Sequence, residues 1–567
     1  MESSEKTYVS RLKVILALFL LIYAALLIAQ FYRQIIKNGY YVALAKAQHL
    51  VAKELVAHRG NIYASSIYQK DPFLLAGNQK LFSLDLVPRQ IADKNNTAEI
   101  LSGIIDLKKE NIFALINNDK SYIPPILDGL SYDQAQTILV KNLDGVYLLP
   151  EDRRFYPQGE LAAQILGYVD NEGKGNYGLE QYYDKELKGD SGYLTAEQDV
   201  FGRYIDVNGE TAPQNGTDLY LTLEMPVQFK AEQIIQDSVK SNGASSGQII
   251  VMNPKTGEII AMAATPSFNP ENYAEAAKDK GIDIFTDPSV SKLYEPGSIF
   301  KAITMATALE KKVITTDKTF NLGASIDIAG NMIWNSDQKS HGTLDPAGIL
   351  QWSDNVGIVT IEQLIGKDEF YKYLLDKFRF NLPTGVDLPN EASYESTEST
   401  AREIEAATMA FGQGIATTPL QIVTAYASIA NGGKMMSPYV VGKQILASGD
   451  EKIITPQELG QTISADASKK LTDMLVSVVN TYESIKINGY EIAGKTGTAQ
   501  VPSPEGGYYT NQTVQSFAGY FPAKDPQFVV LVKLDNPVNS QWAEYSTGPA
   551  FHNLAEFIIN YYQLPKQ

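Results

Sequence analysis

The chain has 567 residues, of which 20% are charged and 44% are apolar, and its formal net charge is −17. This length predicts two or three domains, and the composition is typical of a globular chain. There is no cysteine, which excludes disulfides, thiolate metal sites and a cysteine nucleophile. The acidic balance argues against broad nucleic-acid binding. No metal or other cofactor is predicted, because the histidines lack ligand-like spacing and are interpreted as surface or satisfied core residues: His49, His58, His341 and His552.

The N-terminal segment departs from this soluble character. Residues 14–29 carry no charge, and with Phe31 and Tyr32 they approach the ~20 residues that cross a bilayer. A cleaved signal peptide is the alternative, but no A-x-A-like exit follows the apolar stretch. We therefore expect a cytoplasmic tail over 1–13 and an uncleaved single-pass anchor over 14–32. The remaining mass is expected on the extracytoplasmic face of the cell membrane.

Beyond the anchor, residues 33–50 continue a helical pattern, and irregular α+β segments follow. The stretch IDVNGETAPQNGTD, residues 205–218, is rich in Gly, Pro, Asn and Asp, which indicates turns or a linker. We place the main boundary there. It separates an N-terminal module over 33–215 from a C-terminal domain over 216–567.

The C-terminal domain shows strand patterns at both of its ends and a mostly helical middle. Such an arrangement predicts one sheet that is assembled from both ends and packed with helices, an α+β fold. Residues 253–257 (NPKTG) are predicted to be the turn of a hairpin. Strands are predicted at 219–223, 247–252 and 258–263 and in the runs SFAGYF and FVVLVKLD, and helices in MPVQFKAEQIIQDSVK and FHNLAEFIINYYQ.

The pattern S-x-x-K occurs at Ser3 and Ser10 in the expected cytoplasmic tail, and at Ser289, Ser298 and Ser336. Only Ser298 opens a long uninterrupted helical pattern, directly after a Pro-Gly break. Positions i and i+3 share a helix face, so the Lys301 amine would lie beside the Ser298 hydroxyl, near the unpaired N–H groups of a first turn. A desolvated Lys301 would then take the serine proton. The alternative is an ordinary N-capping serine with a solvated lysine.

A second polar element, Ser353-Asp354-Asn355, stands between two apolar helical patterns. It is predicted to be a loop whose short side chains reach a cleft. Ser353 would relay a proton, and Asn355 would hold Lys301 or a substrate amide. The alternative is an N-cap for the next helix.

A third element, Lys495-Thr496-Gly497-Thr498, lies in a strand-like run. A glycine in a strand lets another backbone approach closely, as a peptide substrate would. The lysine offers a cation and the threonines offer hydroxyls for a carboxylate. The same triplet at 255–257 forms the predicted hairpin turn and is interpreted as structural.

The order S-x-x-K, S-x-N, K-T-G within one domain is shared by class A β-lactamases and penicillin-binding proteins. On these motifs the chain resembles a class B penicillin-binding protein, and the likeness runs from the membrane span nearly to the last residue. Further segments that carry the resemblance are Arg59-Gly60, GNYGLEQYYDKELKGDSG, NPKTGEIIAMAATPSFNP, FGQGIATTPLQ and NGG.

This resemblance implies a monofunctional peptidoglycan D,D-transpeptidase, more like the cell-division type, with a dimerisation or pedestal module before the penicillin-binding domain. The implied fold of that domain is a mixed sheet with helices on both faces, similar to serine β-lactamases. The implied partners are stem peptides and lipid-linked precursors of peptidoglycan, β-lactams as covalent inhibitors, and a membrane glycosyltransferase with other division or elongation proteins.

The resemblance also implies roles for the motif residues. Ser298 attacks the penultimate D-Ala carbonyl and Lys301 accepts its proton. The oxyanion is held by the backbone N–H groups of Ser298 and Thr498. The other side chains protonate the leaving amine (Ser353, Lys495), hold the base or a substrate amide (Asn355) and line the site of the terminal carboxylate (Thr496, Gly497, Thr498).

Several alternatives remain open at this stage. A D,D-carboxypeptidase passes the same acyl group to water, and an elongation-type transpeptidase shares the motifs. A β-lactamase is disfavoured because no E-x-x-L-N follows Ser353, and a non-catalytic β-lactam sensor or scaffold because all motif side chains are retained. Residues 151–155 resemble the start of a glycosyltransferase signature, but Gln158 replaces its histidine, so no glycosyltransferase activity is predicted.

Overall fold

A computed structural model of the chain forms two compact units, Met1–His58 with Gly189–Asn215, and Arg59–Lys188 with Gly216–Gln567. His49, and residues 43–49 of the predicted helical stretch, lie outside the described residues. The structure describes residues 2–42, 50–118, 120, 123, 129–198, 204–394 and 402–566.

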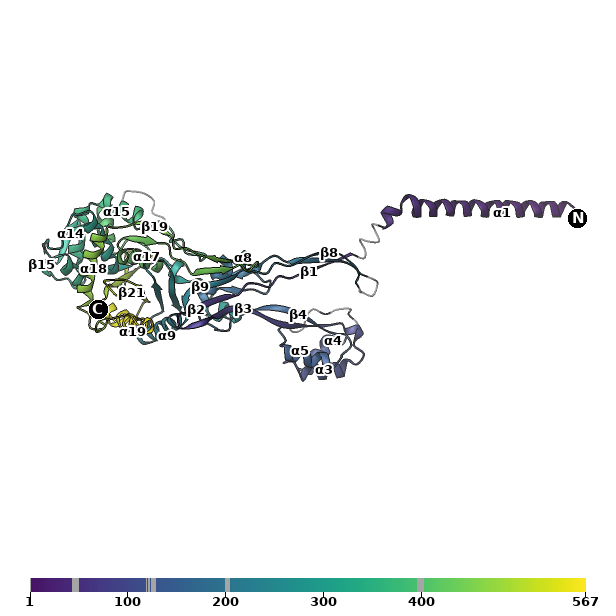
Figure 1. Ribbon diagram of the computed structural model, residues 1–567, viewed down its shortest axis with the longest axis horizontal. Coiled ribbons are helices and arrows are strands. Elements are labelled where there is room, and N and C mark those ends of the chain that lie inside the picture. The colour runs from purple at the N-terminus through teal and green to yellow at the C-terminus, as the bar shows by residue number, and fades with distance from the viewer. Residues whose placement is uncertain are drawn as a thin grey trace. The chain divides into compact units, whose positions relative to one another are not determined.

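The first unit begins with helix α1, Glu2–Phe31, which continues as the π-helical turn η1, Tyr32–Ile36 (Figure 1). Among the described residues, the stretch Val9–Ile36 is the one long and apolar enough to cross a membrane. The predicted apolar helix is therefore confirmed. Ser3 lies in α1, and its side chain is outside those that the structure describes.

The same unit holds a three-stranded sheet in the order β1-β7-β8. Its strands are β1 (Leu50–Leu55), β7 (Gly192–Gln198) and β8 (Tyr204–Thr211). The prediction of turns or a linker over 205–218 is wrong for the residues in β8. The strand continues through the Asn-Gly pair at 208–209 because its register with β7 shifts there. This shift is a β-bulge, which accommodates one extra residue without ending the pairing of the two strands.

The second unit contains a six-stranded sheet in the order β18-β17-β9-β2-β3-β4. Three short helices pack on the ends of β3 and β4 around a small apolar core of their own (Figure 1). The strands are β2 (Ile62–Ser66), β3 (Gln69–Leu86), β4 (Val146–Phe155), β9 (Asp218–Glu224), β17 (Val441–Ile445) and β18 (Glu451–Ile453), and the helices are α3 (Lys94–Ser102), α4 (Lys109–Ile116) and α5 (Tyr132–Val140).

A buried ion-pair cluster ties this sheet to helices α7 (Gly178–Tyr182) and α8 (Asp184–Lys188). Glu180 is fully buried and binds Arg59 Nη2 at 2.7 Å and Arg154 Nε at 2.6 Å. Arg59 also binds Asp184 at 2.8 Å. Burial disfavours the charged form of Arg59, but Glu180 and Asp184 hold its pKa above the ordinary value. The cluster therefore explains why two of the segments that carry the resemblance, Arg59-Gly60 and the one containing Glu180, lie together.

We expect Glu180→Ala to lower the free energy of unfolding by roughly 3–5 kcal/mol, because it leaves two arginines buried without their shared carboxylate. Thermal unfolding in detergent measures this as a lower Tm. The matched control is Asp473→Ala, which removes an exposed ion pair with Lys469 and is expected to cost less than about 1 kcal/mol. Equal Tm values for the two variants would contradict the prediction.

The second sheet of this unit has five strands in the order β11-β10-β22-β21-β20. Strands from both ends of the domain pair directly, since β10 lies between β11 and β22, as predicted. Residues 254–256 form the turn between β10 and β11, so the hairpin is also confirmed. The strands are β10 (Ser246–Met252), β11 (Ile259–Thr265), β20 (Ala493–Pro502), β21 (Tyr508–Phe521) and β22 (Phe528–Asp535).

Helices cover both faces of this five-stranded sheet. Ile249 and Val251 of β10 join an apolar cluster with the helices α9 and α19, whereas Ile250 and Met252 join the large cluster on the other face. This alternation is the period-two pattern of a strand buried on both sides. The predicted α+β fold with helices on both faces is confirmed. The helices are α9 (Met225–Asn242) and α19 (Ala543–Tyr562) on one face, and α12 (Lys301–Glu310), α17 (Pro419–Ala430) and α18 (Ala465–Val479) on the other.

Candidate active site

Ser298 lies in the 3₁₀ turn η5, Gly297–Phe300, which runs directly into helix α12. The N-cap of this turn is Pro296, and no side chain caps it, so Ser298 is not an ordinary capping residue. The Tyr426 hydroxyl of helix α17 donates to the carbonyl of Ile299 at 2.7 Å and so fixes the turn. Ser298 is only partly buried, so its hydroxyl remains available to a ligand.

Two glycines bring this turn against strand β20, which is an edge strand of the five-stranded sheet. A Cβ on Gly497 would meet the Pro296 carbonyl oxygen at 3.1 Å, and a Cβ on Gly297 would meet the Ala499 Cβ at 2.8 Å. Gly297 has a φ of +61°, which other residues rarely adopt. The K-T-G segment and Ser298 are therefore neighbours because neither glycine has a side chain.

Lys301 is fully buried one turn beyond the serine. Its Nζ lies 2.5 Å from the Ser353 carbonyl oxygen, 2.7 Å from Asn355 Oδ1 and 3.1 Å from Ser353 Oγ. Burial lowers the pKa of Lys301 well below its usual range, and repulsion from Lys495 lowers it further, whereas the Asp354 carboxylate raises it. The alternative of a solvated lysine is wrong, and the predicted contact between Asn355 and Lys301 is confirmed.

The Ser353-Asp354-Asn355 segment joins helix α13, Pro346–Gln351, to helix α14, Asn355–Ile365. The predicted loop between helices is confirmed, and so is the alternative of an N-cap. Asp354 caps α14 by accepting from Gly357 N at 2.6 Å, whereas its two neighbours face Lys301. One tripeptide thus serves both purposes, because Asp354 faces the start of α14 whereas Ser353 and Asn355 face Lys301.

Lys495 is the second fully buried lysine of the site. Burial lowers its pKa to about 7. Its Nζ donates to the Thr496 carbonyl oxygen at 3.1 Å, and Thr496 Oγ1 in turn lies 3.1 Å from the Tyr482 hydroxyl. Thr496 and Thr498 are partly exposed on the edge strand. The site therefore offers a lysine that is readily charged or neutral near pH 7, together with two hydroxyls.

The other copies of the motifs lie elsewhere. Ser289 lies within a short helix, α11 (Pro288–Ser291), and Ser336 lies in a turn. Lys255 pairs with Asp525 at 2.5 Å, as expected of a residue in a hairpin turn.

Sequence reasoning missed the residues behind the loop, His341 and Asn335, which contact Asp354. His341 was interpreted as a surface or satisfied core histidine, and it is indeed hydrogen-bonded. The residues next to it in the sequence gave no indication that it lies beside the site.

A five-stranded sheet with helices on both faces, and S-x-x-K, S-x-N and K-T-G gathered at its edge strand, is the arrangement of serine enzymes that recognise penicillin. The family described as "Penicillin binding protein transpeptidase domain" matches residues 247–556, and the "Penicillin-binding Protein dimerisation domain" matches residues 54–221. The chain belongs to this family and is a class B penicillin-binding protein of the septal type.

Two relatives illustrate the similarity. Stage V sporulation protein D of Bacillus subtilis is 33% identical over 83% of this chain and 74% of its own length. Peptidoglycan D,D-transpeptidase FtsI of Escherichia coli is 28% identical over 79% of this chain and 75% of its own. In fold, the chain is similar to Penicillin Binding Protein 2X from Streptococcus thermophilus, with a TM-score of 0.76 and 23% identity over 90% of this chain and 80% of that one.

Proposed function

We propose that this protein is a serine-type peptidoglycan D,D-transpeptidase that cross-links stem peptides through an acyl-enzyme on Ser298, in cell-wall synthesis at division. The observation that carries the proposal is the surroundings of the Lys301 amine. A neutral amine has two hydrogens, and two groups that only accept, the carbonyl of Ser353 and Oδ1 of Asn355, lie within 2.7 Å of it. Its lone pair is then left for a hydroxyl proton, and we assign that proton to Ser298, since Ser353 Oγ at 3.1 Å is placed to pass it on.

In the first step, Ser298 Oγ attacks the penultimate D-Ala carbonyl while Lys301 takes the hydroxyl proton. The backbone N–H groups of Ser298 and Thr498 hold the oxyanion, each worth roughly 3 kcal/mol. The C–N bond then breaks, and Ser353 or Lys495 delivers a proton to the departing D-Ala amine and is reprotonated by Lys301, which becomes neutral again. Thr496 and Thr498 bind its carboxylate.

In the second step, a side-chain amine of a neighbouring stem peptide attacks the ester. The new amide bond forms, the ester bond breaks, and the proton lost by the amine returns to Ser298 Oγ by way of Lys301. β-Lactams acylate the same hydroxyl because their ring amide takes the place of the D-Ala-D-Ala bond.

The remaining modules serve this reaction at a membrane. We place a cytoplasmic tail at 1–13, a single-pass anchor at 14–32, an N-terminal module at 33–215 and the transpeptidase domain at 216–567 on the extracytoplasmic face. Polymerised glycan comes from a separate membrane glycosyltransferase. Arg154 of the region that resembles a glycosyltransferase signature is engaged by Glu180, which supports a structural role for that region.

The choice of acyl acceptor tests the proposal. We expect the full chain in detergent, given a pentapeptide donor ending in D-Ala-D-Ala and an amine acceptor, to release D-Ala and form the amide of donor and acceptor. Mass spectrometry of the products distinguishes this from hydrolysis. If the shortened donor acid were the sole product at saturating acceptor, the protein would be a D,D-carboxypeptidase and the proposal would fail.

A further inference from the structure

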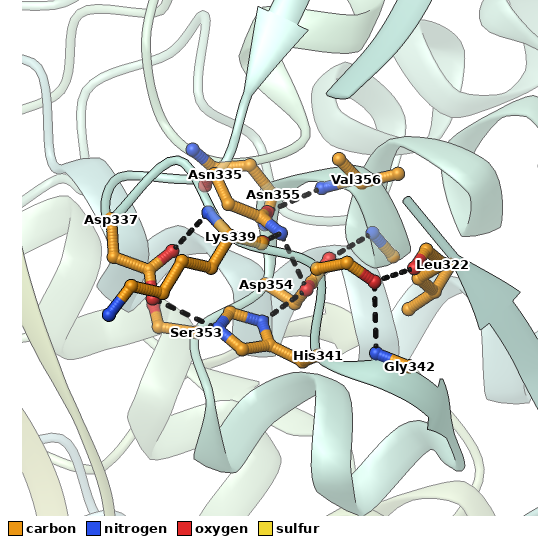
Figure 2. A network of polar contacts seen from close by, with 12 residues as sticks. Leu322, Asn335, Asp337, Lys339, His341, Gly342, Ser353, Asp354, Asn355 and Val356 are labelled. Atoms are coloured by element: carbon orange, nitrogen blue, oxygen red, sulfur yellow. Dashed lines mark hydrogen bonds and ion pairs between the residues drawn. The ribbon is translucent and has the colours of Figure 1, made fainter. Parts of the chain in front are cut away.

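Behind the Ser353-Asp354-Asn355 loop lies a polar network that the three motifs do not include (Figure 2). It comes from the segment between the strands β14 (Asn331–Trp334) and β15 (Gly342–Leu344). The segment contributes Asn335, Asp337 and His341. Asn335 and His341 contact Asp354 of the loop, and Asp337 contacts His341.

Asp354 is the centre of this network and is fully buried. One of its oxygens accepts from Gly357 N, and the other accepts from Asn335 Nδ2 at 2.8 Å and from His341 Nδ1 at 2.6 Å. A carboxylate oxygen accepts, so this contact assigns the hydrogen to Nδ1 of His341. A buried carboxylate needs such donors, because an unpaired one is costly to desolvate.

Asn335 holds the start of helix α14 from the same side. Its side chain is almost fully buried, and its Oδ1 accepts from the backbone N–H of Asn355 at 2.8 Å and of Val356 at 3.2 Å. Its Nδ2 also donates to the carbonyl of Lys339 at 2.9 Å. The first N–H groups of a helix have no partner inside the helix, so one asparagine both satisfies them and locks Asp354.

His341 is held on three sides. Nε2 faces Asp337 Oδ2 at 3.2 Å, Nδ1 faces Asp354, and the ring stacks on Trp352 with centroids 4.7 Å apart. Trp352 directly precedes the Ser353-Asp354-Asn355 loop, and the Lys339 cation acts on Asp337. The imidazole therefore holds the loop in two ways: it stacks on Trp352, which precedes the loop, and it contacts Asp354 at the loop's centre.

The loop needs such a clamp because its conformation is unfavourable. Ser353 has a φ of +52°, a left-handed conformation that non-glycine residues adopt only when their surroundings enforce it. That conformation aims both oxygens of Ser353 at the Lys301 amine. Asn355 is oriented in the same way, since its Nδ2 donates to the Trp334 carbonyl at 2.9 Å and leaves Oδ1 for Lys301.

We propose that His341 and Asn335 are positioning residues for the acyl-transfer reaction, which hold Asp354 so that Ser353 and Asn355 present their acceptors to the Lys301 amine. This inference rests on the proposed function of Ser298 and Lys301. Both residues are placed to act through Asp354, which they contact directly. The charge of Asp354, which favours the protonated form of Lys301, is part of what the histidine holds in place.

The test uses a fluorescent penicillin and the full chain in detergent. It measures the first-order acylation constant separately from the dissociation constant of the non-covalent complex. We expect His341→Ala to lower the first-order acylation constant roughly 10- to 100-fold, as small displacements of reacting groups do. The dissociation constant of the non-covalent complex should stay within about twofold. His341→Asn places an amide donor near the position of Nδ1, and we expect it to recover most of the rate.

A double-mutant cycle supplies the decisive comparison. If His341 acts through Lys301, its removal should cost little in the Lys301→Met background, whereas a merely structural role would cost the same in both backgrounds. The matched control is His552→Ala, a partly buried histidine of α19 whose Nδ1 has no hydrogen-bond partner among the described residues, and it should leave both constants unchanged.

Three results would overturn the inference: an equal loss in both backgrounds, an asparagine variant as slow as the alanine variant, or parallel losses in binding and acylation. Thermal unfolding of each variant identifies any that fails to fold, and in that case the His341→Asn comparison still decides. Failure of the proposed function would look different, because the wild-type chain itself would then not acylate at Ser298.

Discussion

Ser298→Ala is expected to abolish covalent labelling by a fluorescent penicillin. The variant keeps the turn η5, its packing against Gly497 and both buried lysines, and it removes only the attacking oxygen. Loss of the nucleophile of a catalytic unit typically costs at least about 10,000-fold. Gel fluorescence measures the label after saturating exposure. Stoichiometric labelling of this variant would disprove the acyl-enzyme on Ser298.

The chain supplies matched controls for this experiment. Ser289 also begins an S-x-x-K sequence, and it is fully buried, so Ser289→Ala should label as the wild type does. Lys301→Met keeps the Ser298 hydroxyl but removes its base, and general-base losses are about 100- to 10,000-fold. We therefore expect slow but complete labelling of Lys301→Met. If Ser289→Ala also failed to label, loss of the label would report misfolding and would not identify the nucleophile.

Lys495→Met is expected to weaken acylation and to stabilise the fold. The variant removes a proposed proton donor to the leaving amine, which is also the cation beside the hydroxyls proposed to bind the carboxylate. A hydrogen bond to a charged group is worth about 10- to 100-fold in rate. Lys495 itself is fully buried and has few partners, so methionine replaces a group that is costly to desolvate. Function and stability therefore oppose each other at this position.

The stability gain should depend on pH in a definite direction. The pKa of Lys495 is about 7 in the folded chain and 10.5 ordinarily, because burial disfavours the charged form. Between these values the unfolded chain binds more protons, so the wild type becomes more stable as pH rises through this window. The gain from Lys495→Met, on the order of a few kcal/mol, is therefore largest below pH 7 and shrinks towards pH 10.

The corresponding measurement is thermal unfolding of wild type and Lys495→Met at several pH values. The matched control is Lys469→Met, since Lys469 is an exposed residue of α18 with one surface partner, and it should change Tm little at any pH. A Tm difference for Lys495→Met that grows with rising pH would contradict the sign of this argument.

The sequence by itself determined the elements whose signals are local. The apolar run of α1, the strands on either side of the 254–256 turn, and the strand that holds Lys495 were all predictable. The choice of Ser298 among several similar serines was also made locally, from the Pro-Gly break and the helix that follows. Each of these patterns depends on residues a few positions apart, and so it is readable along the chain.

Only the tertiary structure decided the features that join distant segments. Strand β8 forms in a stretch of turn-forming residues because its pairing with β7 outweighs local preference. The two lysines are buried because elements from the whole domain close over them, and that burial lowers their pKa values. Asn335 and His341 reach Asp354 across 13 to 19 residues of chain, a contact that local patterns do not encode.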